Sequence, residues 1–142
     1  MNETVLLTLL TVVTAATPLV YAAIGELVVE RSGVLNLGVE GMLLAGAVSG
    51  FAATHASGSA TLGVVAGFLA GVALAAVFAF LTLSLQSSQV ATGLALTIFG
   101  VGLSALVGQS LVGVALGGLP DIAVPGLSAI PFLGPLLFEH DA

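Results

Sequence analysis

Charged residues are scarce in this 142-residue chain: they fill 6% of its positions, and a single Arg supplies all of the basic charge. A water-soluble domain carries about 25% charged residues, so a soluble globular domain is excluded. One basic residue leaves no surface that could neutralise phosphates, which excludes nucleic-acid binding and a polybasic lipid-binding patch. The chain has no Cys. Disulfides, thiolate metal sites and cysteine nucleophiles are therefore excluded too.

Apolar residues make up 58% of the chain. Two long stretches lack Asp, Glu, Lys and Arg, namely 4–25 and 41–120. A helix needs roughly 20 residues to cross about 30 Å of hydrocarbon, so the first stretch holds one span and the second holds three. We therefore predict an all-α, polytopic integral membrane protein with about four transmembrane helices in one transmembrane domain over 1–142.

The predicted spans cover about 4–24, 41–53, 61–85 and 90–112. The first is expected to be a span because a cleaved signal peptide would have a basic start and a shorter apolar core. The second is too short to cross unless part of 34–40 also lies at membrane depth, which predicts a broken helix or re-entrant element at 33–41. The Pro- and Gly-rich segment 113–135 is expected to be an external loop.

Small residues recur along the third and fourth predicted spans. Such stripes let another helix approach closely, although glycine is also common in membrane helices in general. Two stripes offer more packing surface than one internal contact would use, so partner helices are expected. The predicted helix-packing residues are Gly63, Gly67, Gly71, Gly93, Gly100, Ser104 and Gly108.

Orientation depends on Arg31, since basic residues favour the cytoplasmic side. The connection between the first two spans is then cytoplasmic and the N-terminus lies outside. The expected location is the cell membrane, crossed several times.

Polar side chains gather between the first two spans, within 26–40. Asn36 and Glu40 are four residues apart and would share a face if this segment were helical. Ionisable groups at membrane depth usually face a bundle interior or a water-filled path, which makes these residues candidates for a substrate path. The alternative is that Glu40 only caps the second span, where the helix dipole favours a carboxylate.

Ser32 joins Asn36 and Glu40 in the predicted substrate path, and the backbone at Gly33, Gly38 and Gly41 is expected to line it. Such donors and acceptors suit a neutral substrate that carries hydroxyl groups. The two histidines have no motif context and are expected to be solvated. No catalytic constellation is visible, so we expect neither an enzyme nor a cofactor or metal.

Two stretches resemble a known family: 30–47, ERSGVLNLGVEGMLLAGA, and 89–108, QVATGLALTIFGVGLSALVG. They look like the permease subunits of ABC importers for nucleosides and simple sugars, within the branched-chain-amino-acid-like permease family. The external loop at 117–138 is similar as well. Family members contain two repeats of spans, and the likeness covers the first, so the chain is expected to correspond to an N-terminal half.

The resemblance implies a transmembrane permease subunit that forms part of a translocation path for nucleosides or simple sugars. It implies four kinds of partner: a second permease subunit, a separate ABC ATPase subunit that hydrolyses ATP, a substrate-binding lipoprotein and membrane lipid. The alternative is a membrane scaffold, or decayed half-permease, that transports nothing and only associates with other helices.

Overall fold

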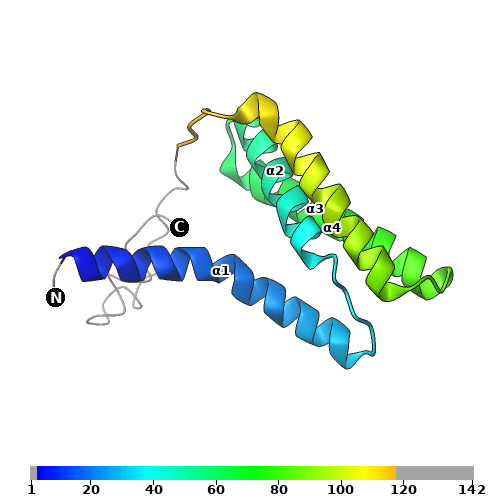
Figure 1. Cartoon of the computed structure of the whole chain (residues 1–142). Helices are drawn as coiled ribbons and strands as arrows, with labels where there is room; N and C mark the ends of the chain where they lie inside the picture. The colour runs from blue at the N-terminus through cyan, green and yellow to red at the C-terminus, as the bar shows by residue number, and fades with distance from the viewer. Residues whose placement is uncertain (1–2, 118–142) are drawn as a thin grey trace. The chain divides into compact units, whose positions relative to one another are not determined.

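The computed structural model describes residues 3–117, all of whose regular elements are helical (Figure 1). Four α-helices are joined by short turns, as the all-α prediction expected. In chain order the elements are α1 (Glu3–Arg31), α2 (Val39–Ser57), α3 (Ala60–Ala79), the π-helical turn η1 (Phe80–Ser84), α4 (Gln89–Gly108) and the 3₁₀ turn η2 (Gln109–Leu111).

Three helical segments of the described range are long and apolar enough to cross a membrane: Thr4–Arg31, Ala60–Ser84 and Gln89–Leu111. They show a multi-pass arrangement. Helix α2 has 19 residues but is not among the three, and its polar residues Glu40 and His55 lie near its two ends. The fourth span therefore stays a prediction.

The predicted boundaries differ from the helices in detail. Helix α1 continues through Pro18 as far as Arg31, well beyond the predicted end at 24. Helix α2 is longer than the predicted 41–53 at both ends, because it begins directly after Gly38 and ends at a left-handed Gly58 with φ +67°. Only the first five residues of the predicted loop 113–135 are described, and the rest lies outside the described residues.

Residues 22–116 form one compact unit, and the start of α1 belongs to a separate one. Within the larger unit α2 packs against both α3 and α4, which contact each other much less. Residues 46 and 50 of α2 approach 67 and 63 of α3, so these helices are antiparallel. Residues 38 and 41 approach 93 and 100 of α4, so α2 and α4 are parallel. Helix α2 is thus the centre of the bundle.

Glycines form the contact between α2 and α3. A β-carbon at Gly67 would lie 2.9 Å from the carbonyl oxygen of Gly46, and one at Gly50 would lie 3.1 Å from that of Gly63. The two backbones therefore touch without intervening side chains, the close approach that small residues permit in membrane helices. Gly71, the third residue of the predicted stripe, has nothing within 4 Å among the described residues.

Helices α2 and α4 cross even more closely. A β-carbon on Gly100 would run into the backbone of Gly41, and one on Gly41 would run into the backbone of Leu96 and Thr97. Backbone atoms cannot move aside as the end of a flexible side chain can. Any larger residue at this crossing must push the helices apart, which also weakens the packing around buried Ala45 and Leu96.

We predict that Gly100→Ala lowers the free energy of unfolding by roughly 1–3 kcal/mol, the usual cost of overpacking. The matched control is Gly102→Ala on the same helix, because Gly102 has nothing within 4 Å among the described residues. That variant should stay within about 1 kcal/mol of wild type. Unfolding in detergent, followed by circular dichroism, gives both values. Equal stability of the two variants would contradict the close α2–α4 crossing.

A second pair tests the α2–α3 contact. A β-carbon at Gly63 would collide with the side chain of Thr54 and approach the Gly50 carbonyl oxygen to 2.8 Å. Gly63→Ala should therefore destabilise the protein by roughly 1–3 kcal/mol, whereas Gly71→Ala should have little effect. The same detergent unfolding experiment measures both. If Gly71→Ala proved as harmful as Gly63→Ala, the helix contact would have been assigned to the wrong residues.

Candidate functional site

The connection between α1 and α2, residues 32–38, is the candidate site, and we call it the break. Helix α1 ends at Arg31, and the chain turns at Gly33, whose φ of +84° lies in the left-handed region that glycine adopts without a steric penalty. The Gly33 N–H donates to the Glu30 carbonyl at 2.9 Å, and the Val34 N–H donates to the Val29 carbonyl at 3.3 Å. This is the paired hydrogen-bond pattern of a Schellman helix end.

Asn36 lies at the centre of the break and is only 8% exposed. Its backbone N–H donates to Oε1 of Glu26 on α1 at 2.9 Å. Its side-chain Oδ1 accepts from the N–H of Gly38 at 2.9 Å, and its Nδ2 lies 3.6 Å from the sulfur of Met42. The side chain thus replaces a backbone partner in the turn that leads into α2, as Asn commonly does in turns.

Helix α4 holds the break from the other side. Oε1 of Gln89 accepts from the N–H of Leu35 at 2.8 Å, and the hydroxyl of Thr97 donates to the carbonyl of Leu37 at 2.8 Å. Between these two residues lies Gly93, where a β-carbon would come within 2.8 Å of the Leu37 nitrogen. The irregular backbone of the break is therefore bonded to side chains that are distant in sequence.

The predicted shared face of Asn36 and Glu40 is wrong. Helix α2 begins at Val39, so Asn36 precedes the helix and a four-residue spacing does not align the two side chains. Glu40 is exposed in the first turn of α2, where the helix dipole stabilises a carboxylate. Ser32 is also exposed, and its hydroxyl donates to the Val29 carbonyl at 2.7 Å.

The three glycines of the predicted path have different surroundings. Gly33 is exposed and has nothing within 4 Å among the described residues. Gly38 and Gly41 are buried, and their backbones pack on α4. The break therefore has an open side and a side that α4 covers.

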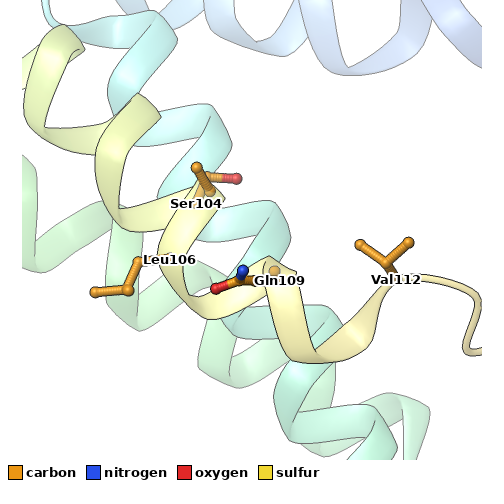
Figure 2. A pocket seen from close by; sticks show the side chains of 6 residues that line it. Ser104, Leu106, Gln109 and Val112 are labelled. Carbon is orange, nitrogen blue, oxygen red and sulfur yellow. The ribbon is translucent and has the colours of Figure 1, made fainter.

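The small residues of α4 differ in what they contact. Gly93 packs on the break and Gly100 packs on α2. A β-carbon at Gly108 would lie 3.8 Å from the Val48 side chain, so Gly108 is in looser contact. Ser104 lines an open hollow of about 670 Å³ around the end of α4 (Figure 2). The labelled side chains around it, Ser104, Leu106, Gln109 and Val112, diverge and do not converge on one point. Among the described residues, its polar side chains are those of Ser104 and Gln109 alone.

Two residues that build the site were not among the predicted site residues. Gln89 directly precedes the predicted span 90–112, and Thr97 is a polar residue within it. A polar side chain inside such a span is itself a signal, because it needs a partner there. Gly46 and Gly50, which oppose α3, have the same four-residue spacing as the stripe that was recognised.

The chain matches the family model described as "Branched-chain amino acid transport system / permease component" over residues 8–129. It is 46% identical over 92% of its length to "Putative glucose ABC transporter permease protein TsgC13" of Haloferax volcanii. It is 28% identical over 87% of its length to "Guanosine ABC transporter permease protein NupQ" of Bacillus subtilis. It is 30% identical over 88% of its length to "Nucleoside ABC transporter permease protein NupC" of Lactococcus lactis.

These matches cover 41%, 42% and 43% of the three relatives. The chain therefore spans less than half of the length of the curated relatives it matches. No solved structure matches it. The family model covers most of the chain, including the break and the whole of α2, α3 and α4. The chain belongs to the family of permease components of branched-chain amino acid transport systems.

Proposed function

We propose that the chain forms part of the transmembrane permease subunit of an ABC importer for nucleosides or simple sugars. The observation that carries this proposal is the 46% identity to a relative named for glucose transport, supported by two relatives named for guanosine and nucleosides. The polar groups of the break suit such substrates, because neutral hydroxylated molecules are recognised by hydrogen bonds.

In the proposed topology α2 is a fourth span. Its 19 residues are about 28 Å long at 1.5 Å per residue, close to the hydrocarbon thickness. It is antiparallel to α3 and parallel to α4, the alternation that successive crossings produce. The proposed orientation places Arg31 on the cytoplasmic side and the N-terminus outside.

The proposed path follows the open side of the break, where Ser32, Gly33 and Glu40 are exposed. Asn36 supports this path from behind, because its amide oxygen bonds the N–H of Gly38. Irregular backbone at membrane depth is tolerated where it is buried in protein or lines a water-filled cavity. On this proposal the side of the break that packs on α4 is buried in protein, and the open side lines the path. The proposed partners are a second permease subunit, an ABC ATPase and a substrate-binding lipoprotein.

Deletion of the gene tests the transport function. In the source organism, uptake of radiolabelled guanosine or glucose should fall at least about tenfold and should return when the gene is restored, while uptake of an unrelated amino acid should not change. The relative loss for the two substrates identifies the class. Unchanged uptake of both substrates in the deletion strain would favour the scaffold alternative.

Substitutions at Glu40 and Asn36 test the path. Glu40→Gln keeps the size and hydrogen-bonding capacity of the side chain but removes its charge, so a moderate uptake defect at normal membrane abundance is expected. Asn36→Leu should be more harmful, since it leaves the buried N–H of Gly38 without its acceptor at a cost of about 1–3 kcal/mol. Uptake and abundance are measured side by side in the chromosomal variants.

The matched control for Glu40→Gln is Glu30→Gln, at an exposed carboxylate in the last turn of α1. It should transport normally. Normal uptake by Glu40→Gln as well would return Glu40 to a role in capping α2. A loss of uptake by Glu30→Gln as large as that by Glu40→Gln would show a general effect of charge, not a path contact.

A further inference from the structure

Three residues on one face of α4, namely Gln89, Gly93 and Thr97, contact the break. They lie four residues apart, so they follow one another along the same side of the helix. Gln89 bonds Leu35, Gly93 packs on residues 37 and 38, and Thr97 bonds Leu37. This face of α4 therefore contacts residues 35, 37 and 38 of the break.

The two hydrogen bonds flank Asn36 on both sides and involve only backbone groups of the break. Their partners are the N–H of Leu35 and the carbonyl of Leu37, each at 2.8 Å. A side-chain change within the break would leave these groups unaltered, whereas a shift of α4 by one residue would remove both bonds. Together they fix the position of the break along α4, and hence that of Glu40, two residues after it.

We propose that Gln89 and Thr97 are positioning residues for transport, which hold the break and α4 as one moving unit. This inference rests on the proposed function, because it assumes that substrate passes the open side of the break. Their hydrogen bonds go to Leu35 and Leu37, not to Ser32, Gly33 or Glu40. Their removal should therefore slow the transport cycle more than it weakens substrate recognition.

The hydroxyl and amide chemistry offers matched variants. Thr97→Val keeps the shape of the side chain but deletes the donor, while Thr97→Ser keeps the donor. Gln89→Leu deletes the acceptor, while Gln89→Glu keeps an acceptor oxygen. Thr11→Val is the control, because the Thr11 hydroxyl bonds only a carbonyl of its own helix, that of Leu7 at 2.9 Å.

The experiment measures uptake kinetics in chromosomal variants and hydrogen exchange of the 32–38 peptide in the purified protein. Thr97→Val and Gln89→Leu should lower the maximal rate about fivefold, with less than about a twofold change in KM, at normal abundance. Gln89→Leu should also speed exchange in that peptide. Thr97→Ser, Gln89→Glu and Thr11→Val should behave like wild type.

Faster exchange with unchanged uptake would overturn the positioning role and leave the proposed function intact. Low membrane abundance of Thr97→Ser and Gln89→Glu, as well as of Thr97→Val and Gln89→Leu, would overturn it too. The two residues would then be needed only for folding. Absence of nucleoside and sugar uptake in the wild type would instead refute the proposed function itself, and the inference with it.

Discussion

Backbone polar groups that leave a helix within apolar surroundings must find new partners, and this constraint governs the centre of the molecule. The break interrupts the helical hydrogen bonds between α1 and α2, which would cost several kcal/mol per unpaired group in lipid. The chain meets the need with side chains from Glu26, Asn36, Gln89 and Thr97. Helix α4 therefore stabilises a segment that is far from it in the sequence.

Close packing of the helices follows from the same requirement. Gln89 and Thr97 reach the break only if α4 lies almost in backbone contact with the start of α2, and Gly41 and Gly100 permit that approach. On its other side α2 meets α3 through Gly46 and Gly67. Two sets of glycines thus bring α2, α3 and α4 together. The hydrogen bonds between α4 and the break depend on this close packing of the helices.

Much of the fold followed from the sequence, because long uncharged runs leave few alternatives to membrane helices. The predicted interruption at 33–41 overlaps the break at 32–38, although its last three residues belong to α2. The roles within it did not follow: Asn36 and Glu40 were paired by helical spacing, but the helix starts only at Val39. Hydrogen bonds such as that between Thr97 and Leu37 join residues 60 positions apart, and no local pattern reports them.

The turn between α2 and α3 has a consequence for membrane insertion on the proposed topology. Only Gly58 and Ser59 separate the two helices, and the Ser59 side chain already accepts from the N–H of Leu62 in the next turn. On the proposed topology, the less apolar α2 is delivered to the bilayer as a hairpin with the strongly apolar α3. The two helices would then enter the bilayer together, so α2 would not have to insert alone. This hairpin can form before α4 has been synthesised.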